Sequence, residues 1–570
     1  MVSVGGRQWI LRAAAVLALV GVAGGIAAVV IDARGDPLLG GPSADPAEPA
    51  SAFLAAWHDG KYRAMYRLVT PQVRSTVPYR QFAHAYRAAA RTAGITAIRQ
   101  VGTVHATLRS ASVSLAVGTA TVGRVYQRLV IPLAEVGDGY RVAWGRQLVF
   151  PGLRPGETLA LKKRVPQGRG RILAQDGSVL AEGPADARVY PQGSPFALVT
   201  GFTRAPEGAD AAARTAAGWP AGQPYGQGGL EASLDSVLGG LPRARLVAVS
   251  STPGVPNRVL GRRQGRKPKD VITTLDVSDQ EAAAAALGAR YGGIVVLDPR
   301  TGAVLADAGL GMDATQPPGS SFKTVTAAAA LTAGTAELTD TYPYAKYVVL
   351  NGWRLRNFHH ELCGGSLVQA FADSCNSVFA PIADEVGAKR LVAMADAFGF
   401  NHGPTIAYPV PRSTTRTPAQ MPSDLSLGVA GIGQGGVVAT PLEMASVAQT
   451  IASGGLRRPP FIVHAPQAAR DKMPPARAVS PTVAGEVTTL MEAVVTEGTG
   501  RSAAVPGVTV AGKTGTAEVG PHRPSDAWFI AFAPAEGPQV AVAVLIVNGG
   551  VGGDVAAPIA RQVLEAALAG

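Results

Sequence analysis

Nineteen consecutive residues near the N-terminus, Ala13 to Ile31, carry no charge, and no other feature limits the possible folds so strongly. A helix of that length crosses the hydrocarbon core of a bilayer. Arg7 and Arg12 precede it, so the positive-inside rule keeps residues 1–12 in the cytoplasm and places the rest of the chain outside. A cleaved signal peptide is the alternative, but its apolar region would be shorter. We therefore expect a single-pass membrane anchor with an extracytoplasmic bulk.

The net charge of the 570 residues is +12, which favours an anionic neighbour. Outside the membrane that neighbour is a wall polymer or lipid headgroups, so we expect no nucleic-acid partner. A basic run at residues 258–269 is predicted to be a solvated hairpin or loop. The two cysteines are too few for a disulfide scaffold or a four-cysteine zinc module.

Three segments separate the anchor from the last part of the chain. Residues 32–50 are expected to be a polar tether because they contain two Asp-Pro pairs and one Pro-Ser pair. Residues 51–150 are predicted to form a small α+β domain. Its expected helices are 51–69 and 78–93, and its expected strands are 111–117, 124–133 and 140–149, with a turn at 137–139. Residues 151–270 are loop-rich, and we assign no chemistry to them.

Residues 271–570 have strand patterns at both ends and helical patterns between them. The expected strands are 271–275, a hairpin over 293–308, 508–511, 527–532 and 540–547, and the outer helices are 279–287 and 556–568. Such an order predicts a mixed sheet covered by helices. The fold class is therefore multidomain α+β behind a transmembrane helix.

A serine and a lysine spaced three apart mark the first candidate catalytic motif. Ser320 and Lys323 open a predicted helix after a Pro-Pro-Gly loop, so their side chains share one face. A serine hydroxyl becomes a nucleophile when a neighbour takes its proton, and a desolvated lysine with a lowered pKa can do so. Donors at a helix N-terminus suit a developing oxyanion.

Two further motifs follow in order. Ser374-Cys375-Asn376 offers a hydroxyl and an amide that can pass a proton and hold a substrate carbonyl. Lys513-Thr514-Gly515-Thr516 offers a positive charge and hydroxyls for a substrate carboxylate, and Gly515 allows a chain to approach the backbone. Each alone could be a helix cap or a turn, but their joint order and spacing favour one catalytic site.

This serine, Ser-x-Asn and Lys-Thr-Gly set makes the chain resemble a class B penicillin-binding protein. Other segments similar to that family are 292–298, 433–435 with 440–442, 498–500 and 527–529. Residues 151–270, from Arg169-Gly170-Arg171 past Gly229-Leu230-Glu231, resemble its pedestal or dimerisation domain. Residues 51–150 resemble the NTF2-like domain of the methicillin-resistance type, and 271–570 resemble the transpeptidase domain.

The resemblance implies a peptidoglycan D,D-transpeptidase that works through a serine acyl-enzyme. Ser320 would attack the penultimate carbonyl of a D-Ala-D-Ala stem peptide, with Lys323 as the base. Backbone amides of Ser320 and Thr516 would form the oxyanion hole. An amine from a neighbouring stem would then resolve the acyl-enzyme into a cross-link, and β-lactam antibiotics would acylate the same serine.

The resemblance also assigns binding roles to the other two motifs. Ser374 would relay a proton, and Asn376 would hold the donor peptide. Lys513, Thr514 and Thr516 would bind the carboxylate of the donor. No cofactor and no metal are expected, and a membrane-embedded glycan polymerase is an expected partner.

Two alternatives use the same architecture. A D,D-carboxypeptidase has the same residues and differs in its acceptor, and a membrane-anchored wall scaffold would have an inactive site. A soluble β-lactamase would need neither an anchor nor the upstream domains.

Two smaller features have simple interpretations. Cys363 and Cys375 lie in an oxidising compartment on either side of a helix-length segment, and we hypothesise a disulfide that braces the Ser-x-Asn loop. His359-His360-Glu361 lacks the spacing of a His-Glu-x-x-His metal site and is predicted to be a surface turn.

Overall fold

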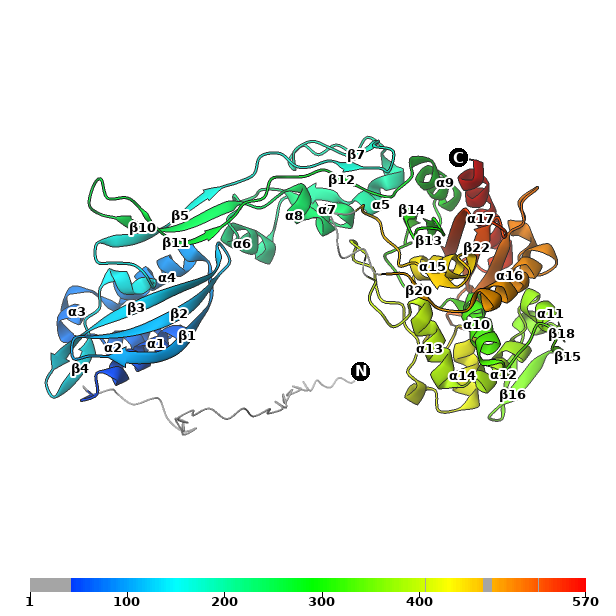
Figure 1. The fold of residues 1–570 in the computed structure, drawn as a ribbon, viewed down its shortest axis with the longest axis horizontal. Coiled ribbons are helices and arrows are strands. Elements are labelled where there is room, and N and C mark those ends of the chain that lie inside the picture. The colour runs from blue at the N-terminus through cyan, green and yellow to red at the C-terminus, as the bar shows by residue number, and fades with distance from the viewer. Residues whose placement is uncertain (1–42, 405, 465–473, 521, 570) are drawn as a thin grey trace, which may run out of the picture. The chain divides into compact units, whose positions relative to one another are not determined.

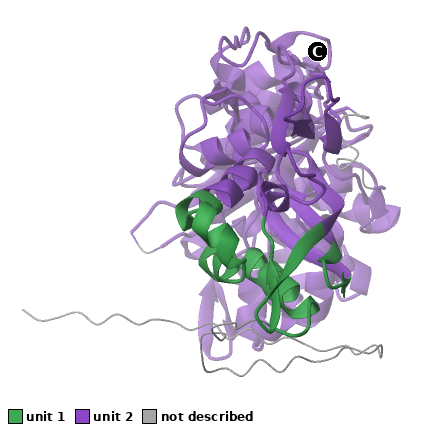
Figure 2. Ribbon diagram, turned by 90° about the vertical axis from the view of Figure 1, so that its left-hand side faces the viewer, with its two compact units in different colours: residues 1–83, 103–113, 130–144 green, residues 84–102, 114–129, 145–570 purple. Residues whose placement is uncertain are grey.

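The computed structural model describes residues 43–404, 406–464, 474–520 and 522–569. The expected cytoplasmic segment 1–12, the anchor 13–31 and most of the tether lie outside these ranges. Within them, no helix combines the length and the apolar character that a membrane span needs. The chain divides into two compact units, coloured separately in Figure 2, and each is described by itself: residues 1–83, 103–113 and 130–144, and residues 84–102, 114–129 and 145–570.

Short helices open the first unit. They are α1 (Ala47–His58), α2 (Tyr62–Arg67) and α3 (Pro71–Thr76). The single helix expected over 51–69 is therefore wrong: it breaks after His58, where Gly60 adopts a φ of +69°. Helix α1 also begins at Ala47, inside the segment expected to be tether. Phe53 and Met65 are fully buried in the core of this unit.

A four-stranded sheet follows α4 (Tyr79–Ala93), in the order β1 (Ile95–Ala106), β2 (Ser110–Thr119), β3 (Gly123–Val136) and β4 (Gly139–Val142). The strands expected at 111–117 and 124–133 are confirmed. The strand expected at 140–149 is wrong beyond Val142, because the chain turns into a short 3₁₀ helix at Arg146–Val149. Strand β1 was not predicted, since most of its residues are exposed and lack an apolar face.

Two three-stranded sheets lie in the segment that precedes the Ser320-Lys323 motif, together with a two-stranded sheet of β8 (Phe202–Arg204) and β9 (Tyr225–Gln227). One has the order β11 (Arg258–Arg263), β10 (Arg243–Ser250) and β5 (Glu157–Arg164), and the other has the order β12 (Val271–Ile272), β6 (Ile172–Leu173) and β7 (Val179–Ala181). Buried ion pairs support this segment: Glu231 is fully buried and accepts hydrogen bonds from Arg169 Nε and Arg188 Nε, both at 2.7 Å.

A five-stranded sheet organises the rest of the second unit (Figure 1). Its order is β14 (Val304–Gly309), β13 (Gly292–Leu297), β23 (Val540–Ile546), β22 (Asp526–Ala533) and β21 (Ala511–Ala517). All four neighbouring pairs of strands in this sheet are antiparallel. The hairpin expected over 293–308 and the strands at 527–532 and 540–547 are confirmed. The expected mixed sheet is wrong in that respect, because strands from both ends of the segment pair antiparallel.

Helices cover both faces of this sheet. Helices α9 (Val277–Leu287) and α17 (Gly552–Ala569) share a core with one set of alternating strand residues, including Val296, Phe529 and Val544. The opposite set packs on helices that include α10 (Lys323–Ala333), α15 (Pro441–Ala452) and α16 (Pro481–Thr496). Strands buried on both faces are typical of a central sheet.

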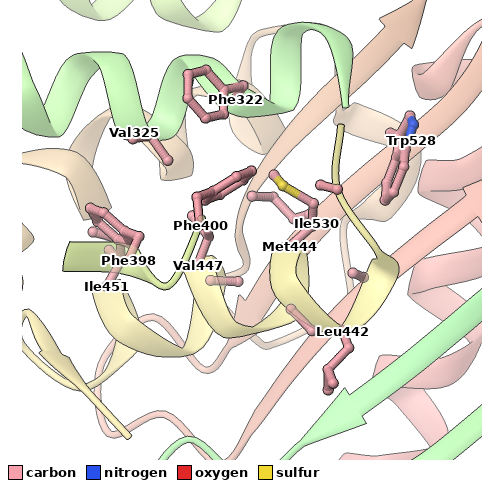
Figure 3. Close-up of a cluster of buried hydrophobic side chains, with 14 of the residues drawn as sticks. Phe322, Val325, Phe398, Phe400, Leu442, Met444, Val447, Ile451, Trp528 and Ile530 are labelled. Carbon is pink, nitrogen blue, oxygen red and sulfur yellow. The ribbon is translucent and has the colours of Figure 1, made fainter. Parts of the chain in front are cut away.

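The core beneath the Ser320-Lys323 motif is apolar and aromatic. Figure 3 shows Phe322 and Val325 above Phe400 and Met444, with Ile530 beside them. Phe322 and Phe400 pack edge to face with ring centroids 5.3 Å apart. This packing fixes the start of α10 against α15 and the sheet, so the residues just before it have a rigid support.

Candidate active site

Ser320 lies in a 3₁₀ turn, Gly319–Phe322, that leads directly into α10. Gly319 donates its amide to Gly433 O at 3.0 Å and adopts a φ of +54°, where a Cβ would lie 2.9 Å from Thr516 O. The neighbouring Ser321 is buried and donates its hydroxyl to Pro318 O at 2.7 Å. Ser320 is partly exposed, so it is the serine of this turn that a substrate can reach.

Lys323, one helical turn further, is completely buried. Its Nζ donates to Ser374 O at 2.6 Å, to Asn376 Oδ1 at 2.8 Å and, more weakly, to Ser374 Oγ at 3.3 Å. Burial, and after it the charge of Lys513, holds the pKa of Lys323 well below its usual range. A lysine whose ammonium form is disfavoured in this way loses its proton more readily and can then accept one from a hydroxyl.

The Ser-x-Asn motif lies between α11 (Leu367–Ala372) and α12 (Asn376–Val386). Ser374 has a φ of +61°, a strained conformation for a residue with a Cβ. A disulfide joins the next residue, Cys375, to Cys363, with Cα atoms 5.8 Å apart, which confirms the hypothesis of a bridge beside this motif. Asn376 also donates its Nδ2 to Arg356 O at 3.0 Å. These links hold the strained loop against Lys323.

The Lys-Thr-Gly motif lies within β21 rather than after a strand at 508–511, so that expectation is corrected. Lys513 pairs with Ile530 and Gly515 with Trp528 of β22, and this pairing imposes the strand on a polar segment. A Cβ on Gly515 would lie 2.6 Å from Pro318 O. The glycine therefore lets the strand edge approach the Ser320 turn.

Lys513 is the second fully buried lysine of the site. Its Nζ donates to Thr514 O at 3.2 Å and lies 5.3 Å from the centre of the Phe371 ring. Burial lowers the pKa of Lys513 to about 7, and the carboxylate of Asp373 opposes part of this shift. The amine can therefore gain or lose its proton near neutral pH.

One cavity of about 1050 Å³ brings the three motifs together. Among the predicted site residues it is lined by Ser320, Ser374, Asn376, Thr514 and Thr516. Lys323 and Lys513 are buried behind this lining, and Gly515 supports it by its close approach to Pro318. Ser320 and Lys323 are on one turn as expected, but the hydrogen bonds of the amine go to the Ser-x-Asn loop.

Further residues line the cavity that sequence reasoning did not assign to it. Arg354, Arg356, His359 and His360 form one wall, and His359 and His360 both have positive φ values. The expected surface turn at these histidines is therefore part of the rim of the site. Thr499 lines the cavity as well, and its hydroxyl shares a hydrogen bond of 2.7 Å with the Thr514 hydroxyl. Thr499, from segment 498–500, and Gln434 and Gly435, from segment 433–435, had a local signal, because both segments resemble the family.

Throughout the described ranges, no group of three or more His, Cys, Asp or Glu side chains is placed to hold a metal ion. The chemistry available at the cavity is that of a nucleophilic hydroxyl, a buried amine and a set of hydrogen-bond donors. This combination suits acyl transfer.

Family models match most of the described chain. The model described as the penicillin binding protein transpeptidase domain matches residues 292–565, and the one described as the NTF2-like N-terminal transpeptidase domain matches residues 45–157.

Curated relatives are similar over much of their length. The chain is 35% identical to the peptidoglycan D,D-transpeptidase PbpA of Mycobacterium tuberculosis, over 74% of this chain and 93% of that protein. It is 26% identical to the peptidoglycan D,D-transpeptidase MrdA of Acinetobacter baumannii, over 66% and 65% of the two chains.

Solved structures show the same similarity in three dimensions. The crystal structure of PBPA from Mycobacterium tuberculosis aligns with a TM-score of 0.56 at 33% identity, over 70% of this chain and 99% of that chain. The penicillin G acyl-enzyme complex of the same protein aligns equally, with a TM-score of 0.56. The D,D-transpeptidase domain from Eggerthella lenta aligns with a TM-score of 0.58 at 30% identity, over 70% and 98%.

Proposed function

Because the chain belongs to the penicillin-binding protein family of peptidoglycan D,D-transpeptidases, we propose that the motifs at its cavity carry out that reaction. The protein cross-links peptidoglycan through a serine acyl-enzyme formed on D-Ala-D-Ala stem peptides, and β-lactams bind it covalently. The observation that best supports the assignment of residues is the shared cavity, which is lined by Ser320 together with residues of both other motifs.

In the first half of the reaction, Ser320 Oγ attacks the penultimate D-Ala carbonyl carbon while its proton passes to the neutral amine of Lys323. Amides of Ser320 and Thr516 hold the oxyanion. The bond to the terminal D-Ala nitrogen then breaks, and Ser374 relays a proton to that nitrogen. The hydrogen bond of 3.3 Å between Lys323 Nζ and the Ser374 hydroxyl supports this route for the proton.

In the second half, an amine of a neighbouring stem attacks the ester carbon of the acyl-enzyme. The amine loses a proton, the bond from the carbon to Ser320 Oγ breaks, and the oxygen regains a proton, so the serine is restored. Asn376 positions the donor peptide, and Lys513, Thr514 and Thr516 bind its carboxylate before the terminal D-Ala leaves. Thr499 joins this group because its hydroxyl is paired with that of Thr514.

Intact mass after exposure to benzylpenicillin tests the assignment of the nucleophile. We expect the wild-type chain to gain the mass of one opened drug molecule and Ser320→Ala to gain none. Ser321→Ala is the matched control, because its hydroxyl is buried and occupied by Pro318 O. An adduct on Ser320→Ala would overturn the assignment.

The acceptor distinguishes transpeptidation from the two alternatives. With donor and acceptor stem peptides present together, a transpeptidase produces dimers, whereas a carboxypeptidase releases D-Ala and leaves trimmed monomers. An inactive scaffold would give neither product and no Ser320-dependent penicillin adduct.

The membrane location and the limits of the domains belong to the same proposal. Residues 13–31 would anchor the chain with its N-terminus in the cytoplasm. Residues 51–150, 151–270 and 271–570 would follow outside as the NTF2-like, pedestal and transpeptidase domains. The full chain should then stay in the membrane pellet after alkaline extraction, and protease added to the outer face should digest the catalytic domain.

A membrane-embedded glycan polymerase is the proposed partner of the anchor. The family analogy supports this pairing, because the reaction described above only joins stem peptides and requires glycan strands made elsewhere. A photo-crosslinker at Leu19 should capture such a polymerase. A crosslinker at an exposed residue such as Lys389 is the control. Capture of the same proteins from both positions would contradict the proposed pairing.

A further inference from the structure

One face of the sheet formed by β5, β10 and β11 carries an array of basic side chains far along the chain from the active-site motifs. Lys162, Arg245 and Arg262 lie directly opposite one another across the three strands. Arg164 and Arg243 form a second row two residues further along. Residues opposite in register, and residues two apart on a strand, share a face. We call these five exposed residues the basic ladder.

The basic ladder lacks compensating charge. Like charges opposite each other on neighbouring strands destabilise a sheet. The only acidic residue in the three strands is Glu157, and it is paired with Arg258. Within the part of the chain that the structure describes, none of the five ladder side chains forms an ion pair or a side-chain hydrogen bond.

The cations on the opposite face of the sheet have internal partners instead. Lys163 donates to Trp219 O at 3.4 Å, and Arg263 donates to Pro242 O at 3.1 Å and Ala120 O at 3.2 Å. These side chains tie the sheet to its surroundings. The ladder side chains make no such contacts within the protein. Because their mutual repulsion is not relieved internally, we infer that an anion from outside the chain neutralises them.

We propose that the basic ladder binds the carboxylates of stem peptides on an uncross-linked peptidoglycan strand. This inference rests on the proposed function, since it concerns the polymeric form of the substrate. Arginine, which supplies four of the five ladder residues, presents a planar fork that matches a carboxylate. Stems repeat along a strand, so binding of one raises the effective concentration of the next.

The composition of the face favours this occupant over a lipid surface. The residues beside the ladder on the same face are Ala160, Val247 and Val259, of which Val247 is buried, and the three strands contain no aromatic residue. Helices and patches that bind membrane interfaces usually add Trp, Phe or Leu to their basic residues. Sugar rings stack on aromatic side chains, so a face without them is suited to the charged stems rather than to the glycan.

Binding of labelled, soluble, uncross-linked strands to the full chain in detergent micelles tests the proposal. Acylation with benzylpenicillin first blocks the active site. We expect the triple variant Lys162→Gln, Arg245→Gln, Arg262→Gln to bind at least about tenfold more weakly, with a smaller dependence on salt. The control triple Arg80→Gln, Lys389→Gln, Arg390→Gln removes the same charge from exposed residues elsewhere and should bind like wild type. The charge-keeping triple Lys162→Arg, Arg245→Lys, Arg262→Lys should retain binding.

Three results would overturn the inference. The first is equal weakening in the control triple, which would show only general attraction to positive charge. The second is undiminished binding of strands whose stem peptides have been removed. The third is tighter, ladder-dependent binding to anionic phospholipid vesicles or to a phosphodiester polymer than to intact strands. Failure of the proposed function would be seen separately, as absence of the Ser320 adduct in the blocking step.

Discussion

Lys323 Nζ donates a hydrogen bond of 2.8 Å to Asn376 Oδ1, so the buried amine of one motif is held by the amide of another. Its other two acceptors, the carbonyl and hydroxyl oxygens of Ser374, are uncharged as well. A buried ammonium surrounded by neutral acceptors remains destabilised, which explains why burial dominates the lowered pKa of Lys323. The Ser-x-Asn motif thus orients the amine without fixing a proton on it.

Asn376→Asp should move the pH dependence of acylation. A carboxylate within hydrogen-bond distance favours the ammonium and typically raises the pKa of its partner by about one to three units. Because the neutral amine is the proposed base, the acid limb of the benzylpenicillin acylation rate should shift to higher pH. Asn351→Asp adds the same charge at an exposed residue outside the cavity and should leave the profile unchanged. An unshifted profile in Asn376→Asp would argue against Lys323 as the base.

Lys323→Arg should slow acylation by roughly 10² to 10⁴, the usual contribution of a general base, because arginine keeps its proton at every accessible pH. Stopped-flow measurement with benzylpenicillin gives the rate. Lys323→Ala removes the base without adding a larger side chain. If loss of the base slows acylation, this variant should be slow as well, and disturbed packing by the guanidinium is then not the cause. The exposed Lys389→Arg is the control. Wild-type rates in folded Lys323→Ala would contradict the mechanism.

Lys513 should limit the reaction on the alkaline side. Its pKa of about 7 means that it is protonated below that pH and neutral above it in the free protein. Only the protonated form attracts the donor carboxylate, so kcat/KM for a donor stem peptide should fall as the pH rises above about 7. Lys513→Arg keeps its charge and should extend the plateau to higher pH. If kcat/KM of Lys513→Arg instead falls with the same midpoint pH as the wild type, the alkaline limb of the profile belongs to another group.

The apolar parts of the fold were predictable from the sequence, and the catalytic edge strand was not. Strand β23 and residues 527–533 of β22 contain only apolar residues, and such uninterrupted runs identify buried strands directly. Strand β21 contains Gly512, Lys513, Thr514 and Gly515, a sequence with no apolar alternation. Its strand conformation comes from pairing with β22, a tertiary contact that a local pattern does not encode.

The residues of the site also fall into those that the sequence predicts and those that it does not. Residues whose chemistry is carried by a short motif, such as Ser320 and Lys323, could be named from spacing alone. Arg354 and His359 could not, because they reach the cavity only after the hairpin of β16 (Tyr347–Leu350) and β17 (Trp353–Arg356) has folded back beside it. The prediction of a surface turn at His359-His360-Glu361 rests on the absence of the His-Glu-x-x-His spacing. That spacing carries no information about which residues lie near the turn in the folded chain.

Removing the disulfide should loosen the Ser-x-Asn loop. Cys363 and Cys375 are both buried, and the bridge ends between Ser374 and Asn376. Closing a loop of this size typically stabilises a fold by about 2–4 kcal/mol. The double variant Cys363→Ala, Cys375→Ala should lower the free energy of unfolding by about that amount and slow benzylpenicillin acylation. Equal acylation rates in the variant and the wild type would show that the loop holds its geometry without the bridge.

Glu231→Gln should strongly destabilise the segment that carries the β5, β10 and β11 sheet. The carboxylate is fully buried between Arg169 and Arg188, so its loss removes the charge paired with Arg188 and leaves Arg169 with Asp235, a change that typically costs about 3–5 kcal/mol. Fluorescence of Trp219, which lies 4.8 Å from Arg214, provides a probe of urea unfolding near this network. Asp270→Asn breaks the exposed pair with Arg171 and should cost less than about 1 kcal/mol. Equal costs in the two variants would show that the buried ion pairs add no more stability than a surface pair.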